Sequence, residues 1–259
     1  MARVSSVRYC ETIWSDVIPG NFHTSHCLEP AVLAAEIALD LSPKQHKRVV
    51  WRLDGGAGSD AHLIWLFQRG YHVVAKGMNN RRAVALARQV SRWDAIQENA
   101  WVGEVPAPID YGRKVRVFVK KRLKDNKLIY SYYVSSLSLS SKKLFMKQYD
   151  ARGAAEIEQF RNDKSGLGLE ARRKRNFFGQ KGYILLTDLA HNLLADFYHL
   201  ALVDSAFHDY GPKRIVRDIL AVPGRMSFEN DQLVRVDLIS QMQSANTLVT
   251  CLKKYLNSN

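Results

Sequence analysis

The sequence predicts an α/β fold in which two parallel strands are joined by a helical crossover, and three observations lead to this class. Residues 49–99 alternate strand and helix patterns in the order βαβα, which favours a parallel pair. Residues 100–147 carry two strand-like runs separated by LKDNK, which is a hairpin signature. The rest of the chain, residues 1–48 and 148–259, shows mainly helical patterns.

Each element of residues 49–99 has its own boundary signal. VVWRLD predicts a buried strand, and SDAHLIWLFQRG predicts a helix that Ser59 caps and Gly70 closes. YHVVAKG predicts a second strand, and NRRAVALARQV a second helix. We expect residues 49–99 to form the first part of the core.

The flanking regions are expected to differ from this core. Residues 1–48 are interpreted as a helical lead-in without strands, because EPAVLAAEIALDL is rich in Ala and Leu. Residues 100–147 are interpreted as a β-rich insertion with the strands VRVFVKKR and KLIYSYYVSSLSL. Residues 148–259 are interpreted as a helical C-terminal part, whose run GYILLTDLAHNLLADFYHLALV is too interrupted by His and Asp to span a membrane.

Charge indicates the class of partner. The chain of 259 residues has 38 Lys and Arg against 25 Asp and Glu, a formal net charge of +13. Such an excess favours a polyanion, and nucleic acid is the leading candidate. The three cysteines are scattered without CxxC spacing, which argues against a disulfide framework or a thiolate zinc site and fits a reducing cytoplasm. No signal peptide or membrane span is evident, so we expect a cytoplasmic protein.

One carboxylate stands at a position where α/β proteins place ligands. Asp54 follows the buried strand VVWRL and precedes GGAG, so small residues surround it. These glycines would let a backbone or a metal-bound phosphate come close. A tight turn in which Asp54 only caps the next segment is an equally good interpretation of this stretch. The spacing does not match the GxGxxG dinucleotide fingerprint, so metal binding suits it better.

A single carboxylate holds Mg²⁺ weakly, so a partner acid is expected elsewhere. The candidate segment is YDARGAAEIEQFRNDK, which predicts a helix. Tyr149, Arg152 and Glu156 are spaced by three and four residues, so they share one helix face. A solvated helix face would show the same spacing.

The sequence resembles the catalytic domain of bacterial insertion-sequence transposases of the DDE type, in the group with a Tyr-Arg-Glu-Lys signature. Three stretches carry the resemblance, in this order: RLDGGAGSDAHLIWLFQRGYHVVAKG, YDARGAAEIEQFRNDK and LLTDLAHNLL. The resemblance covers nearly the whole chain. It implies a ribonuclease-H-like α/β core, interrupted by a β-rich insertion and followed by a helical part. It also implies a metal-dependent enzyme that cuts DNA and joins strands at transposon ends and target DNA, as a homodimer in a synaptic complex.

The resemblance assigns roles residue by residue. Asp54 matches the second of the family's three acids and Glu156 the third, so these two residues are expected to be catalytic and to bind Mg²⁺ or Mn²⁺. Tyr149, Arg152 and Lys164 match the signature, whose expected role is contact with DNA phosphates. Two basic clusters are further candidates for phosphate contact. They are Arg172, Arg173, Lys174 and Arg175, and, in the insertion, Arg113, Lys114, Arg116, Lys120, Lys121, Arg122, Lys124 and Lys127.

Two departures from the family pattern leave alternatives open. Seven residues separate Glu156 from Lys164 where the family has six, so Glu158 competes as the third acid, although only Glu156 fits the spacing from Arg152. The family's first Asp lies on an early strand, and neither Asp16 nor Asp40 is expected on a strand. The chain therefore resembles a transposase without its N-terminal part. An inactive remnant that only binds DNA is the alternative function.

Overall fold

The computed structural model describes residues 1–171, 175–239 and 244–258, apart from the side chains of 24, 151–162 and 171. The chain divides into two compact units. Unit 1 consists of Met1–Val4 and Asp16–Ala154, and unit 2 of Ser5–Ser15 and Ala155–Asn259. In the described part of the chain, no helix has the length and apolar character needed to cross a membrane.

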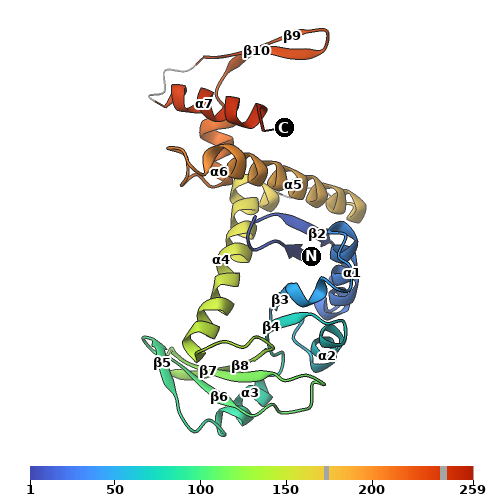
Figure 1. Ribbon diagram of the computed structural model, residues 1–259, viewed down its shortest axis with the longest axis vertical. Helices are drawn as coiled ribbons and strands as arrows, with labels where there is room; N and C mark the ends of the chain where they lie inside the picture. The colour runs from blue at the N-terminus through green and yellow to red at the C-terminus, as the bar shows by residue number, and fades with distance from the viewer. Residues whose placement is uncertain (172–174, 240–243, 259) are drawn as a thin grey trace. The chain divides into compact units, whose positions relative to one another are not determined.

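Unit 1 is built on a six-stranded mixed sheet with the order β3-β4-β8-β7-β6-β5, and Figure 1 shows β5 to β8 side by side. β3 pairs with β4 in parallel, and all other neighbours are antiparallel. The β-rich segment thus extends the sheet of the parallel pair. The strands are β3 (Val50–Leu53), β4 (His72–Lys76), β5 (Asp94–Gln97), β6 (Ala100–Val105), β7 (Arg116–Lys124) and β8 (Lys127–Ser135).

Helices of unit 1 follow the predicted βαβα order. α2 (Asp60–Gln68) begins after Ser59, whose hydroxyl accepts a hydrogen bond from the His62 N–H, and the chain leaves it through Gly70 at φ +87°. α3 (Asn80–Ala87) follows β4. α1 (Leu28–Ala38) and the short turns η1 (Thr24–Cys27) and η2 (His46–Arg48) precede β3. Apolar residues of these elements and of one sheet face form a single core, so the predicted parallel pair and its crossover are confirmed.

The opposite face of the sheet is covered by the first turns of α4 (Lys142–Gly166). Phe145 stacks on Phe118 of β7 with ring centroids 4.2 Å apart, and Tyr149 meets Tyr133 of β8 edge to face at 4.7 Å. Aromatic pairs of this kind add to the free energy gained by burial. The predicted signature helix is therefore confirmed as a helix, and its first turns are anchored on the sheet.

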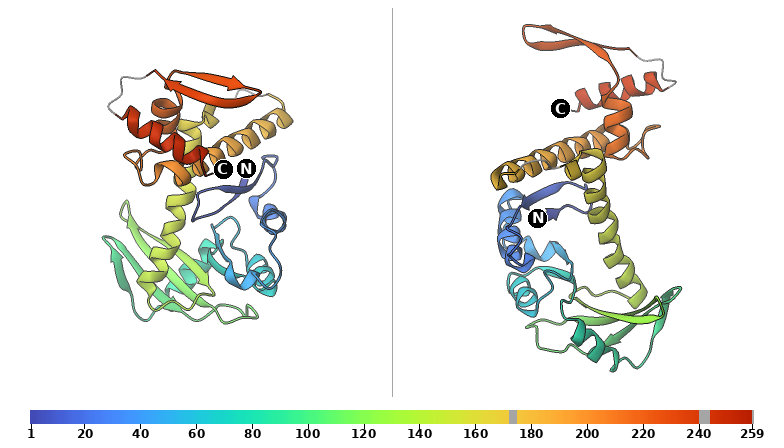
Figure 2. Two further views of the ribbon diagram at one scale, coloured as in Figure 1. Left: turned by 45° about the horizontal axis from the view of Figure 1, so that its top comes forward. Right: turned by 180° about the vertical axis from the view of Figure 1, so that it is seen from behind.

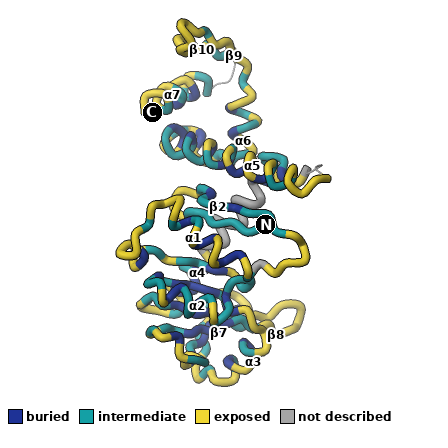
Figure 3. Tube along the Cα trace, turned by 90° about the vertical axis from the view of Figure 1, so that its right-hand side faces the viewer, coloured by how far each residue is buried: buried dark blue, intermediate teal, exposed yellow. Residues whose placement is uncertain are grey.

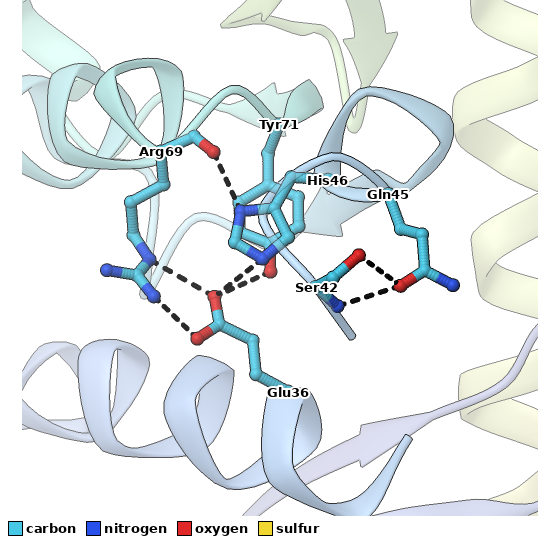
Figure 4. A network of polar contacts seen from close by, with 6 residues as sticks. All are labelled: Glu36, Ser42, Gln45, His46, Arg69 and Tyr71. Atoms are coloured by element: carbon cyan, nitrogen blue, oxygen red, sulfur yellow. Dashed lines mark hydrogen bonds and ion pairs between the residues drawn. The ribbon is translucent and has the colours of Figure 1, made fainter. Parts of the chain in front are cut away.

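A partly buried ion pair connects α1 to the chain between α2 and β4 (Figure 4). Glu36 accepts hydrogen bonds from the Arg69 guanidinium at 3.1 and 2.5 Å and from the Tyr71 hydroxyl at 2.6 Å. His46 stacks on Tyr71 at 4.2 Å, and its Nδ1 lies 2.8 Å from the Arg69 carbonyl oxygen. Burial alone would raise the pKa of Glu36, but the hydrogen bonds from Arg69 and Tyr71 outweigh it and hold that pKa below its usual value.

Unit 2 is mainly helical, with a core around Phe197, Leu202 and Phe207. α5 (Phe177–Phe197) is the longest helix that lies wholly in this unit. Polar side chains of its LLTDLAHNLL motif form hydrogen bonds with the backbone of the segment 5–15. His191 lies 2.7 Å from both the Asp163 carboxylate and the Cys10 carbonyl oxygen. The helical elements after α4 are η3 (Leu169–Ala171), α5 (Phe177–Phe197), η4 (Tyr198–Leu202), α6 (Pro212–Arg214), η5 (Ile215–Leu220) and α7 (Ala245–Leu256).

The expectation that residues 1–48 contain no strand is wrong. β1 (Ala2–Ser5) and β2 (Thr12–Asp16) form a two-stranded sheet, and Asp16 is the last residue of β2. The side-chain amide of Asn192 binds both the N–H and the carbonyl oxygen of Thr12, each at 2.8 Å. Because this support comes from 180 residues further along the chain, the local pattern did not reveal the strand.

The expectation of a purely helical part after residue 148 is also wrong. β9 (Gly224–Glu229) and β10 (Gln232–Leu238) form an antiparallel hairpin, which Figure 2 shows apart from the helices of its unit. Phe228 pairs with Leu233 and Met226 with Val236 on one face of the hairpin. All four side chains are exposed, as Figure 3 shows for the strands as a whole. No part of the chain that the structure describes covers this apolar face.

Candidate active site

Asp54 lies at the carboxyl end of β3, at one edge of the sheet. Leu53 before it is buried in the core, whereas Asp54 itself is exposed. Its Oδ1 accepts a hydrogen bond from the Gly56 N–H at 2.9 Å, and its carbonyl oxygen accepts one from Ala57 at 3.3 Å. Asp54 makes no ion pair with any residue that the structure describes, so its carboxylate has further oxygen lone pairs to offer.

The glycines after Asp54 make room for the neighbouring strand. A Cβ atom added at Gly58 would lie 1.9 Å from the Lys76 carbonyl oxygen at the end of β4. A Cβ atom at Gly55 would meet the Lys76 side chain at 3.7 Å, an ordinary contact distance. Gly58 is therefore required by the close approach of two backbones, which fixes the loop that carries Asp54.

Tyr149 belongs to the same unit as Asp54 and packs on the sheet face that carries Lys76. Lys76 pairs with Tyr133 across β4 and β8, and Tyr149 contacts that tyrosine ring. The Tyr149 ring is only 6% exposed, so most of its surface is used for packing on the sheet. Contact between Tyr149 and a DNA phosphate stays a prediction.

The other signature residues are placed only in part. Arg152, Glu156 and Glu158 lie on α4, but their side chains are outside the described residues. Lys164 is exposed near the end of the helix. Arg172, Arg173 and Lys174 lie outside the described residues, and Arg175 is exposed. The geometry between Asp54 and Glu156, and the choice between Glu156 and Glu158, stay predictions.

The described residues fit a divalent metal only in part. Asp54 offers hard carboxylate oxygen, which suits Mg²⁺ or Mn²⁺. Among the residues that the structure describes, no three His, Cys, Asp or Glu side chains form a group that could hold a metal ion. Asp60, the nearest acid along the chain, accepts hydrogen bonds from Arg82 at 2.6 Å and Tyr111 at 3.1 Å. Of the two predicted metal ligands, Asp54 is thus the one whose side chain the structure describes, and a metal site there needs further acids.

Basic residues of the β-rich segment divide into two groups. Lys121 lies over the Trp93 and Trp101 rings, 4.5 and 5.0 Å from their centroids, and Arg116 forms an ion pair with Glu104. The described part of the chain gives no ion pair to the exposed residues at the hairpin tip, namely Arg122, Lys124 and Lys127. The charges of these tip residues, and that of the exposed Lys114, are therefore open to phosphate.

Sequence reasoning missed two cations beside Asp54. Arg52 lies on β3 two residues before it, and Lys76 ends the neighbouring strand β4. The register of the parallel pair could have found Lys76, since residues that end adjacent parallel strands meet at one edge of the sheet. A pattern of metal-binding acids includes neither of these two cations.

A mixed α/β sheet with an exposed acid at the end of a parallel strand, followed by a helix with the Tyr-Arg-Glu signature, defines the class of ribonuclease-H-like DDE domains. The family transposase DDE domain group 1 matches residues 19–258, and the chain belongs to this family. The resemblance to DDE transposases and the predicted fold class are thereby confirmed. DDE transposases act on DNA and generally use a divalent metal. No curated protein matches the chain.

Proposed function

We propose that this chain is the catalytic domain of an insertion-sequence transposase, with Asp54 and Glu156 as metal ligands for DNA strand cleavage and strand transfer. The observation that carries the proposal is Asp54 itself. It is exposed, makes no ion pair within the described residues, and lies in a loop that Gly58 holds at the edge of the sheet. The hydrogen bond from the Gly56 N–H to its Oδ1 also fits the simple turn, and the exposed carboxylate without an ion pair is what favours metal binding.

Each group in the proposal has a chemical role. Bound Mg²⁺ or Mn²⁺ would stabilise the attacking and leaving oxygens of an in-line displacement at phosphorus. Asp54 and Glu156 hold the metal, because carboxylate oxygens are the ligands that these ions prefer. Arg152, Lys164 and the cluster of Arg172, Arg173, Lys174 and Arg175 bind phosphates of the transposon end and the target without reading their sequence.

The proposal also covers the setting in which the domain works. Two copies act as a homodimer in a synaptic complex, because the transposases that the chain resembles bring two DNA ends together. The proposed setting is a bacterial cytoplasm: the resemblance implies the bacterial source, and three cysteines without CxxC spacing fit a reducing compartment.

The alternative function is a DNA-binding remnant without catalysis, and it leads to a prediction about the polypeptide of residues 1–259. Under this alternative, the polypeptide binds duplex DNA but releases no 3′ hydroxyl ends with Mg²⁺ or Mn²⁺. Asp54 and Glu156 supply only part of the carboxylate set for two ions, and Asp60 is held by Arg82 and Tyr111. The measurement is nicking of supercoiled plasmid DNA.

Nicking that disappears in both Asp54→Ala and Glu156→Ala would contradict this expectation and show a complete site. Glu158→Ala in the same assay would decide between the two candidate third acids. Glu29→Ala is the matched control, because Glu29 is an exposed acid of unit 1 in the first turn of α1.

DNA binding should be strongly salt-dependent and largely independent of sequence. Replacing Arg172, Arg173, Lys174 and Arg175 by Gln should reduce the slope of log affinity against log salt by several units, about 0.9 for each lost phosphate contact. Fluorescence anisotropy of a labelled duplex measures it. The control replaces Lys44 and Lys47, two exposed lysines before β3, and should leave the slope unchanged. An unchanged slope in the fourfold variant would identify its cluster as an ordinary solvated surface.

A further inference from the structure

Lys76 and Arg52 are half-buried cations for which the described part of the chain provides no carboxylate partner. Partly buried charges in folded proteins are normally paired, because removal from water is costly when no opposite charge compensates. In the same unit, Arg69, Arg82 and Arg116 each have an acid within 2.7 Å. Lys76 and Arg52 therefore differ from the structural cations of unit 1.

Lys76 is positioned beside the carboxylate of the proposed site. β3 and β4 pair in parallel with Leu53 opposite Ala75, so the next residues along the two strands are Asp54 and Lys76. Neighbouring strands lie about 4.8 Å apart. The Lys76 stem passes along Gly55, where an added Cβ atom would lie 3.7 Å from its Cδ. The stem is thus held by packing next to the loop of Asp54.

Arg52 approaches the same place from β3. It pairs with Val74, whose side chain packs with Phe118 and Tyr133 on the sheet face that α4 covers. Strand alternation puts Arg52 on this face together with Lys76, which pairs with Tyr133. The Nη1 atom of Arg52 is buried and has no hydrogen-bond partner. A buried guanidinium nitrogen without an acceptor is costly, and an anionic ligand would supply the acceptor.

We propose that Lys76 and Arg52 bind the non-bridging oxygens of one DNA phosphodiester next to Asp54. The inference rests on the proposed function and names two binding residues that the family signature in this sequence does not include. Within the described residues, neither cation forms an ion pair with Asp54 or with another acid, so both charges can serve a phosphate. The Lys76 stem and the Arg52 guanidinium approach the loop of Asp54 from adjacent strands. This arrangement favours one compact anion, such as a single phosphate, over an extended anionic surface.

The test uses the full chain with Lys76→Met, Arg52→Met and the control Lys44→Met. Methionine keeps an unbranched apolar stem and removes the charge. Anisotropy titrations of a 30-base-pair duplex from about 50 to 300 mM NaCl should show the log–log slope reduced by about 0.9 in each single variant and about 1.8 in the double variant. Lys44 is exposed and lies outside β3 and β4, and its variant should match the unmodified chain.

A second readout separates phosphate binding from a structural role. Removing a positive charge beside Asp54 should strengthen Mn²⁺ binding, measured by electron paramagnetic resonance without DNA, by roughly fivefold. A merely structural residue would weaken Mn²⁺ and DNA binding together, which would overturn the inference. If the Lys76 and Arg52 variants bound DNA normally with an unchanged log–log slope, this inference would be overturned and the proposed function would stand. If the unmodified chain failed to bind DNA, the proposed function would fall and the inference with it.

Discussion

Glu36→Ala should lower the free energy of unfolding of unit 1 by about 3 kcal/mol, the range expected when one partner of a buried ion pair is removed. The Glu36 side chain is only 12% exposed, and its loss leaves the fully buried Tyr71 hydroxyl and the Arg69 guanidinium without their acceptor. Urea unfolding followed by tryptophan fluorescence measures the effect. Trp51, Trp65, Trp93 and Trp101 report on unit 1.

The effect of Glu36→Ala should also depend on pH. The pKa of Glu36 is lower in the folded chain than in the unfolded chain, so the ionised carboxylate contributes stability above the ordinary glutamate pKa. This contribution is lost as the pH falls through the folded value, which lies below the ordinary glutamate pKa. The difference between the variant and the unmodified chain should therefore shrink in acid.

The matched control for this effect is Glu29→Ala. Glu29 lies on the same helix, in its first turn, and is exposed. Its replacement should cost less than about 1 kcal/mol, the size of a helix-dipole contribution. Equal stability losses for the two variants, or a Glu36 effect that does not change between neutral and acid pH, would contradict the role assigned to the network.

Gly58→Ala should lower the free energy of unfolding of unit 1 by about 3 kcal/mol, which is at the upper end of the costs seen for overpacking. It should also weaken Mn²⁺ binding. The added Cβ atom would lie 1.9 Å from the Lys76 carbonyl oxygen and 2.9 Å from its carbonyl carbon. These are backbone atoms of a paired strand, so the loop with Asp54 must move instead. Urea unfolding and Mn²⁺ titration measure the two effects.

Gly55→Ala is the control for Gly58→Ala, because it changes the same loop. Its nearest contact would be the flexible Lys76 side chain at 3.7 Å. The change in unfolding free energy should stay within about 1 kcal/mol, since Gly→Ala also restricts the unfolded chain. If Gly58→Ala were as stable as Gly55→Ala, the close approach of the two backbones would not be what requires a glycine.

The core of the fold could be predicted because its signals are local. VVWRL, the Ser59 cap and the φ +87° at Gly70 each act within a few residues, and β3, α2 and β4 lie where they were expected. β2 could not be found this way, because its support comes from the distant side chain of Asn192. Long-range support of this kind leaves no periodic pattern in the strand.

The C-terminal hairpin was missed although a local signal exists. Asn230 and Asp231, between β9 and β10, both have positive φ, as a tight hairpin turn requires. Alternating apolar residues on both sides of this dipeptide would have predicted the strands. Strongly helical patterns on both sides of the hairpin led to the prediction that the whole region is helical.

The candidate site was predictable to the extent that it lies at the end of a strand. Asp54 could be found from a buried run followed by glycines, but Lys76 and Arg52 needed the strand register. Register follows from which strands pair, and here an antiparallel β8 joins β4 on the side away from β3. That pairing connects Lys76 with Tyr133 and Tyr149, a relation between residues far apart in the sequence.

The central claim is that Asp54 is a metal ligand at the end of β3, and anomalous diffraction from crystals of the full chain soaked in Mn²⁺ tests it most directly. We expect a manganese peak within about 2.2 Å of an Asp54 carboxylate oxygen, with a carboxylate of α4 as a further ligand. The peak should be absent from Asp54→Asn crystals treated in the same way. A manganese ion bound elsewhere, with Asp54 left hydrogen-bonded only to the Gly56 N–H, would contradict the claim.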